Sequence, residues 1–173
     1  QKQLAAITAL ELSQYAKARR LAQPLLDASP ADDTRLPEWM HVVAEATLLE
    51  SPQDRGARDK AETIYRELVA KFSDHPRATR ARLRIGWCLQ SNQKPDEAIG
   101  YLTQSIARFE KQQQLPEAQL MIGQCHASRG RHRESINALE AALSANANWQ
   151  RADEVLIAAA QSHVALNEHD AAS

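Results

Sequence analysis

The sequence has little glycine, few aromatic residues and no long hydrophobic run. Only 5 of its 173 residues are Gly, and Phe, Tyr and Trp together make up 5% of the chain. No segment shows the alternating pattern of a strand, while Ala, Leu, Gln, Arg and Glu are abundant. These are strong helix formers, so the composition predicts an all-α protein.

The balance of charge and the short apolar runs exclude several classes of protein. Lys and Arg number 21 against 22 Asp and Glu, which gives a net charge of −1. A general binder of nucleic acid or anionic membrane would carry a strong basic excess. The longest apolar run, Val155 to Ala160, is too short to span a bilayer, and the start QKQLAAITAL lacks the layout of a signal peptide. Because the chain begins without Met and stops where a further helix should start, we interpret it as a fragment of a longer protein.

One pattern recurs at a fixed interval along the chain. Ala61, Ala98 and Ser135 are spaced by 37 residues, and so are Gly86 and Gly123. Small residues at two fixed positions of a repeat of this length predict a solenoid of stacked helical hairpins. We therefore expect residues 1–173 to form a single array of four hairpins and the start of a fifth.

Helix boundaries are predicted from the spacing of apolar residues and from Pro and polar stretches. Pro24 lies within the second helix, where we expect a kink or an early end. The polar stretch from Ser51 to Asp59 predicts an inserted loop, which leaves the register of the Trp39 helix open by one turn. The expected helices are residues 2–12, 15–28, 37–49, 61–72, 77–90, 95–110, 116–128, 132–145 and 151–166, with one more beginning at 169.

The repeated residues resemble the tetratricopeptide repeat family. Gly86 and Gly123 stand at the small position of a first helix, and Ala98 and Ser135 at that of a second. The apolar residues that accompany them are Leu83, Ile85, Leu89, Leu102, Ile106 and Phe109 in one unit, and Leu120, Ile122, Leu139, Ala142 and Leu143 in the next. The resemblance implies a right-handed superhelix of antiparallel hairpins that binds a protein or peptide and is not an enzyme.

A smaller resemblance concerns the run YRELVAKFSDHPRATRARLRIGWCLQ and the DEAI that follows it. This stretch is similar to repeats of bacterial cell-envelope proteins, namely outer-membrane assembly lipoproteins and the Tol-Pal coordinator. It favours the bacterial periplasm or cell envelope over the cytoplasm. A structural spacer, a self-association arm acting through the uncapped end, and a regulatory appendage of a larger protein are alternative functions.

The inner face of such a superhelix, formed by the first helix of each hairpin, is the candidate partner-binding surface. Trp87 flanked by two arginines could anchor a peptide that carries an acidic or aromatic residue. In the alternative interpretation, Trp87 packs against a neighbouring repeat and the arginines are solvated. The residues predicted to bind a partner are Arg80, Leu83, Arg84, Trp87, Leu120, Gln124, Ile157 and Gln161.

Other recurring residues have simpler explanations than chemistry. His126 and His163 share one repeat position, His132 and His169 another, and both are positions where the resemblance implies an aromatic residue, so no metal site is expected. Cys88 and Cys125 also share a position, on helices roughly 8–10 Å apart, which is too far for a disulfide. The sequence contains no phosphate-binding Gly-rich loop, GxSxG, HExxH or CxxC motif. We therefore expect neither catalysis nor a cofactor.

Overall fold

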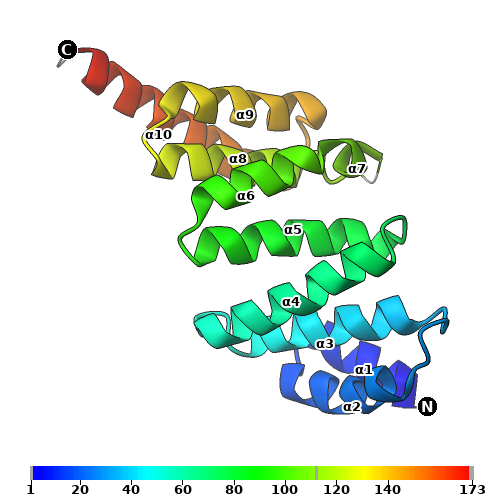
Figure 1. Cartoon of the computed structure of the whole chain (residues 1–173). Helices are drawn as coiled ribbons and strands as arrows, with labels where there is room; N and C mark the ends of the chain where they lie inside the picture. Colours follow the sequence, from blue (N-terminus) through cyan, green and yellow to red (C-terminus); the bar gives the residue numbers. More distant parts are fainter. Residues whose placement is uncertain (1, 112, 172–173) are drawn as a thin grey trace. The chain divides into compact units, whose positions relative to one another are not determined.

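The part of the chain that the structure describes, residues 2–111 and 113–171 of a computed structural model, contains ten helices and no strand (Figure 1). The predicted all-α fold class is therefore confirmed. Among the described residues, no helix is both long enough and apolar enough to cross a membrane. In chain order the helices are α1 (Lys2–Glu11), α2 (Tyr15–Ala28), α3 (Leu36–Glu50), α4 (Arg55–Lys71), α5 (Pro76–Ser91), α6 (Pro95–Gln104), α7 (Ile106–Lys111), α8 (Leu115–Ser128), α9 (His132–Ala145) and α10 (Ala152–Ala171).

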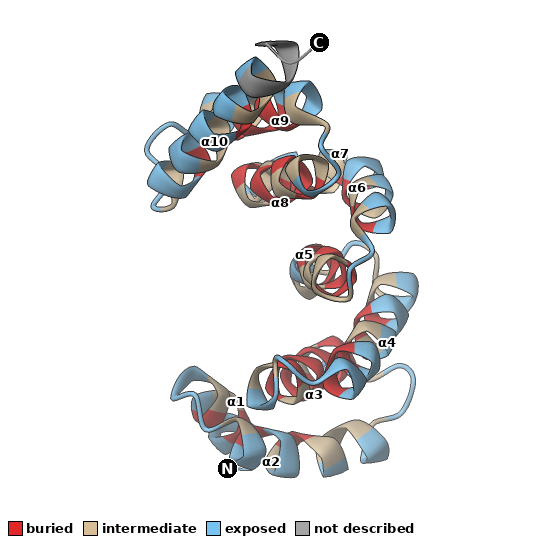
Figure 2. Ribbon diagram, turned by 90° about the vertical axis from the view of Figure 1, so that its left-hand side faces the viewer, coloured by how far each residue is buried: buried red, intermediate tan, exposed pale blue. Residues whose placement is uncertain are grey.

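The chain divides into two compact units inside α5. The N-terminal unit is Gln1–Cys88 and the C-terminal unit is Leu89–Ser173. In the N-terminal unit α3 packs against both α2 and α4, and α1 packs against α2. Buried residues run along nearly the whole of α3 (Figure 2). Small side chains let α1, α2 and α3 approach closely, and the core that they form consists of Ala6, Ala9, Ala18, Ala22, Val42, Val43 and Ala46.

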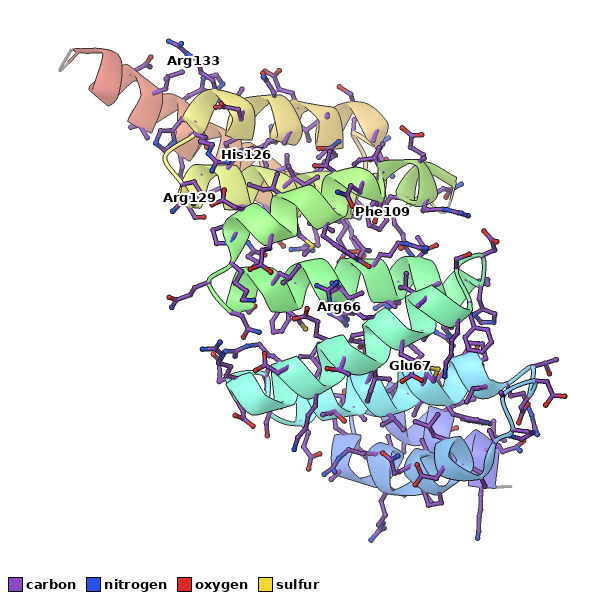
Figure 3. All side chains as sticks on the ribbon, in the orientation of Figure 1. Arg66, Glu67, Phe109, His126, Arg129 and Arg133 are labelled. Carbon is purple, nitrogen blue, oxygen red and sulfur yellow. The ribbon has the colours of Figure 1, made fainter. Side chains whose placement is uncertain are left out.

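In the C-terminal unit α8 packs against both α6 and α9, and α9 packs against α10. Its core contains Leu120 from α8, Leu139 and Ala142 from α9, and Val155 from α10. α7 carries Phe109 (Figure 3). The side chain of Phe109 is fully buried. The predicted ladder of apolar residues thus forms the core of this unit.

Left-handed turns close four of the helices with the same hydrogen bond. The second residue after the helix end adopts a left-handed conformation, with φ of 57° at Ser13, 61° at Gln93, 56° at Gln113 and 71° at Gly130. The next amide then donates to a carbonyl five residues back, which satisfies a carbonyl at the helix end. These bonds are Gln14 N to Ala9 O (2.8 Å), Lys94 N to Leu89 O (2.9 Å), Gln114 N to Phe109 O (2.9 Å) and Arg131 N to His126 O (3.0 Å).

Gly123 marks the closest approach of α8 and α9. A Cβ atom at this position would lie 2.7 Å from Cγ and 2.8 Å from Cδ2 of Leu139, which is fully buried. These separations are shorter than carbon atoms tolerate, so Leu139 or a helix would have to move. The small residue that recurs every 37 positions is thus required here by close helix packing.

We expect Gly123→Ala to lower the free energy of unfolding by about 1–3 kcal/mol, because the added methyl group overpacks the contact with Leu139. Gly100→Ala is the matched control, since Gly100 lies within α6, is exposed, and has no atom within 4 Å of the place that a methyl group would occupy. It should raise the free energy of unfolding by roughly 0.5–1 kcal/mol through helix propensity. Urea denaturation followed by circular dichroism measures both, and a stabilising Gly123→Ala would contradict the packing argument.

The loop predicted from Ser51 to Asp59 is shorter in the structure, because α4 already begins at Arg55. The side chain of Asp54 accepts hydrogen bonds from the amides of Gly56 (3.0 Å) and Ala57 (3.2 Å). This is an N-cap, which satisfies amides that have no partner within the first turn. The prediction missed Asp54 as the start signal of the helix.

The single helix predicted for residues 95–110 is divided at Ser105 into α6 and α7. The hydroxyl of Ser105 donates to the carbonyl of Tyr101 at 3.1 Å. Such bonds from Ser to the carbonyl four residues earlier bend and weaken helices. Apolar spacing cannot reveal a break of this kind, since Phe109 keeps its position on the buried face.

The end predicted at Leu166 and the new helix predicted from His169 are wrong, because α10 continues to Ala171. Neither Asn167 nor Glu168 interrupts a helix as Gly or Pro does. Residues 172 and 173 lie outside the described residues, so the second helix predicted for a fifth hairpin is not part of the described structure.

Pro24 does not end α2, which continues for four residues to Ala28. Proline removes one backbone donor, here the amide that would bond to the carbonyl of Arg20. Both residues are exposed, so water can bind the carbonyl that is left. The early end considered for this helix is therefore not observed.

Candidate partner-binding site

The predicted residues of α5 lie in the N-terminal unit with very different exposure. Arg80 is exposed, Arg84 and Trp87 are partly buried, and Leu83 is buried in the core. Leu83 therefore offers no surface to a partner and is instead part of the hydrophobic core. We call these four residues of α5 the α5 row. Its accessible parts are the ring of Trp87 and the guanidinium of Arg80.

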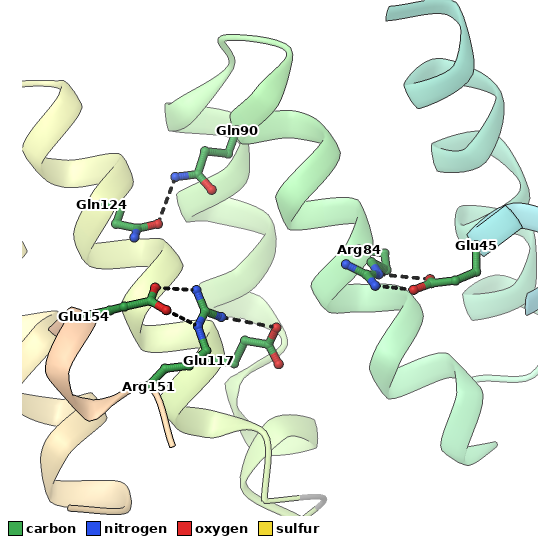
Figure 4. A network of polar contacts seen from close by, with 7 residues as sticks. All are labelled: Glu45, Arg84, Gln90, Glu117, Gln124, Arg151 and Glu154. Atoms are coloured by element: carbon green, nitrogen blue, oxygen red, sulfur yellow. Dashed lines mark hydrogen bonds and ion pairs between the residues drawn. The ribbon is translucent and has the colours of Figure 1, made fainter. Parts of the chain in front are cut away.

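Arg84 is held by a buried carboxylate on α3. Its Nε donates to Oε2 of Glu45 at 2.9 Å, and its Nη2 forms a second bond with Oε1 (Figure 4). The hydroxyl of Tyr65 on α4 also donates to Oε2 of Glu45, at 2.5 Å. Glu45 is only 5% exposed. One carboxylate thus connects α3, α4 and α5, and Arg84 is part of the packing of the unit.

The pKa of Glu45 reflects two opposing effects. Burial alone would raise the pKa of this carboxyl group, but the hydrogen bonds and charge of Arg84 outweigh it, and the pKa lies below its ordinary value. A second pair, Arg77 Nε to Glu38 Oε2 at 2.8 Å, joins the same two helices nearer their N-terminal ends. The two pairs fix the register of α3 that the sequence left open.

His41 lies one turn from Glu45 in the same buried region. It is 3% exposed, and its Nδ1 has no hydrogen-bond partner. Burial lowers the pKa of His41 to about 4; Glu45 opposes this, whereas the charges of Arg77, Arg80 and Arg84 add to it. His41 is therefore neutral at pH 7. Sequence reasoning missed this cluster, although an acid within the apolar run of α3 was a signal for it.

A hollow of about 560 Å³ lies between α8, the start of α9 and α10 in the C-terminal unit. Three of the predicted residues, Gln124, Ile157 and Gln161, line it. Ile157 is 59% exposed and gives the hollow an aliphatic wall. Leu120 is fully buried and offers no surface to a partner. The other lining residues are Ala127, His132, Glu154, Ala158, Ser162 and Ala165.

Polar groups are fixed around this hollow. Gln124 accepts a hydrogen bond from Nε2 of Gln90 at 3.3 Å, which leaves its own amide nitrogen as a donor (Figure 4). The hydroxyls of Ser135 and Ser162 lie 2.9 Å apart and are buried. Side-chain amides carry both donors and acceptors, as a peptide backbone does. The lining thus presents hydrogen-bonding groups beside an aliphatic wall.

Arg151 lies between two glutamates at one end of the hollow. Its Nε and Nη2 donate to Oε1 and Oε2 of Glu154 at 3.0 and 2.8 Å, and its Nη1 lies 3.8 Å from Oε1 of Glu117 (Figure 4). The guanidinium also lies over the Trp149 ring, 5.3 Å from the centroid. The hydrogen bonds from Arg151 lower the pKa of Glu154. Arg151 thus joins Glu154, which lines the hollow, to Glu117, which does not.

The histidines and cysteines singled out in the sequence lie on several different helices. No group of three His, Cys, Asp or Glu residues in the described part of the chain could hold a metal ion. His126 lies in α8 near the turn that carries Arg129 (Figure 3), His163 is exposed, and the side chain of His169 lies outside the described residues. Both cysteines are free thiols, and burial raises the pKa of Cys88 to about 12 and that of Cys125 to about 11.

Comparison with solved structures identifies similar folds. TTC0263, a thermophilic TPR protein of Thermus thermophilus, is 18% identical with a TM-score of 0.66, over 93% of this chain and 77% of that one. BtubC (BKLC) from P. vanneervenii is 14% identical with a TM-score of 0.75, over 96% and 72%. The TPR-like repeats of a putative kinesin light chain of Podosopora anserina are 16% identical with a TM-score of 0.72, over 99% and 88%. At these identities the similarity concerns the fold.

Comparison of sequences gives the family. No curated protein matches the sequence. Residues 53–112 and 89–148 match the tetratricopeptide repeat family, and together they cover more than half of the chain. With helical hairpins, a constant interval between small residues and solved structures of the same fold, the chain belongs to the tetratricopeptide repeat family.

Proposed function

We propose that this chain is a scaffold that holds a peptide or partner protein, and that the hollow between α8 and α10 is a binding site. Proteins of this repeat family generally mediate protein–protein interaction and are typically not enzymes. The observation that carries the assignment is the exposed aliphatic side chain of Ile157 between the amides of Gln124 and Gln161. Binding sites combine apolar walls with a few placed polar groups in this way.

Ile157→Lys should weaken a peptide bound in the hollow by about 30-fold, because it removes an anchor of the kind that dominates interfaces. The matched control is Leu156→Lys, since Leu156 is 54% exposed on the same helix but does not line the hollow. Peptides selected from a random displayed library on the whole chain, measured by titration calorimetry, provide the test. If every selected peptide binds both variants equally, the hollow is not the site.

The accessible part of the α5 row is a separate contact in the N-terminal unit. Arg80 is exposed on α5, seven residues before the partly buried Trp87, and such a pair suits an acidic or aromatic residue of a partner. Arg80→Glu tests this contact without disturbing the bonds between Arg84 and Glu45. Leu83 and Arg84 belong to the α5 row but act through packing within the unit, not through contact with a partner.

Self-association is a second candidate, and the exposed apolar residues Leu156, Ile157 and Val164 of α10 favour it. Contiguous exposed apolar surface is typical of interaction sites. Light scattering over a range of protein concentrations tests this alternative. A rising mass that Leu156→Lys abolishes would support it, whereas a constant monomer mass would exclude it.

The place of action that we propose is the bacterial cell envelope. Residues 65–90 are similar to envelope repeats, and this similarity is the support for the assignment. Fractionation of the source cells followed by immunoblotting tests it, and recovery in the cytoplasm alone would contradict it.

A further inference from the structure

The acidic end of the hollow has more negative than positive charge. Glu117 and Glu154 flank Arg151, and Asp153 is exposed one turn before Ile157. Two carboxylates thus lie against a single guanidinium. The side chains of Glu117 and Glu154 are 38% and 52% exposed, and Glu154 lines the hollow.

This excess of negative charge is local. The opposite end of the hollow shares His132 and Ala165 with a neighbouring depression lined by Arg131 and Arg133. The chain as a whole is close to neutral. A charged ligand group therefore finds a preferred end of the hollow and is not attracted to the surface in general.

The distances along α10 relate the acidic end to the aliphatic wall. Glu154 precedes Ile157 by three residues, which is about 4.5 Å along a helix axis. A residue of an extended peptide advances about 3.3 Å, and a Lys or Arg side chain adds reach on a flexible stem. A Lys or Arg within three residues of an aliphatic side chain can therefore meet Glu154 while the aliphatic group contacts Ile157.

We propose that the hollow selects an extended peptide in which an aliphatic side chain and a Lys or Arg lie within three residues of each other. The aliphatic group packs on Ile157, the Lys or Arg lies beside Glu154, and the amides of Gln124 and Gln161 bond to the peptide backbone. This inference rests on the proposed function of the hollow and specifies its ligand.

The test uses peptides from a random seven-residue displayed library, selected on the whole chain and kept if Ile157→Lys abolishes binding and Leu156→Lys does not. Most of them should contain the predicted pair. Replacing their Lys or Arg with Gln should weaken binding about tenfold to the unmodified chain, but less than twofold to the Glu154→Gln variant, because the carboxylate that the Lys or Arg meets is gone. The control is Glu140→Gln, an exposed glutamate of α9 that does not line the hollow, where the tenfold loss should persist.

The outcomes separate this inference from the function on which it rests. Two results would overturn the inference and leave the hollow as a binding site. In the first, the peptides that depend on Ile157 contain no Lys or Arg. In the second, they bind equally well after their Lys or Arg is replaced with Gln. Failure to recover any peptide that depends on Ile157 would overturn both. A loss of binding on Gln replacement that is the same in the Glu154→Gln variant would place the Lys or Arg elsewhere and also refute the assignment.

Discussion

Replacing Arg84 with Ala is expected to lower the free energy of unfolding by about 3–5 kcal/mol. The change removes both bonds from the guanidinium to Glu45 and leaves a carboxylate that is 5% exposed with only the hydroxyl of Tyr65 as partner. An unpaired buried charge is expensive because the surrounding protein solvates it far less well than water does. Urea denaturation at pH 7, followed by circular dichroism, measures the loss.

Two further variants isolate the cause of that loss. The pair Arg77–Glu38 joins the same helices but is more exposed, so Arg77→Ala should cost at most about 1 kcal/mol. In the double variant Glu45→Gln with Arg84→Met no charge is left unpaired, and the amide still accepts from Tyr65, so most of the stability should return. If Arg84→Ala costs no more than Arg77→Ala, the buried pair does not have the role described.

Acid should destabilise the protein through His41 well before carboxylates are protonated. The pKa of His41 is about 4 in the folded chain, below its ordinary value of 6.5, because the ring is buried. Between these pH values the unfolded chain takes up a proton that the folded chain does not, so the free energy of unfolding falls as the pH falls. The slope is about 1.4 kcal/mol per pH unit, which amounts to roughly 3 kcal/mol by pH 4, with no contribution above about pH 6.5.

Glu45 extends the acid sensitivity to lower pH. Its pKa is lowered in the folded state, so its stabilisation is present above the ordinary pKa and is lost as the pH falls through the folded value. The two groups therefore act in successive pH ranges, with His41 first.

Denaturation at pH 7.0 and pH 4.5 distinguishes the contribution of His41. The His41→Leu variant lacks the titrating ring, so its free energy of unfolding should depend on pH in this range by about 2–3 kcal/mol less than that of the unmodified chain. The comparison uses the difference between two pH values, so any packing change that Leu introduces cancels. An identical pH dependence in both proteins would show that His41 does not titrate as described.

The helices could be predicted because their signals are local. Pro95 and Pro116 lie in first helical turns, and α2 and α9 have the boundaries expected from apolar spacing and turn residues. Ser105 shows the limit of such signals, because its hydroxyl acts on the backbone without altering the pattern of buried residues. Asp54 is also a local signal, for the start of α4, but the polar residues around it led to the prediction of a loop.

The candidate site could be predicted only in part, because burial depends on neighbours that repeat positions do not specify. Leu120 and Ile157 occupy the same position of the repeat, 37 residues apart. Leu120 is fully buried among Leu139, Ala142 and Val155, whereas Ile157 is 59% exposed. The bonds between Glu45 and Arg84 could not be predicted either. They join residues 39 apart, and the register of the helix that carries Glu45 was open in the prediction.

The position of the division between the two units has a consequence for how the chain can be cut or exchanged. Cys88 and Leu89 both lie within α5, which continues to Ser91, and both are buried. Proteases need exposed, extendable backbone, so the division is protected while the turn after Ser91 is not. Recombination that exchanges repeats would likewise preserve intact helices only when its crossover falls in such a turn. The boundary between the two compact units is therefore not a boundary at which repeats can be exchanged without cutting a helix.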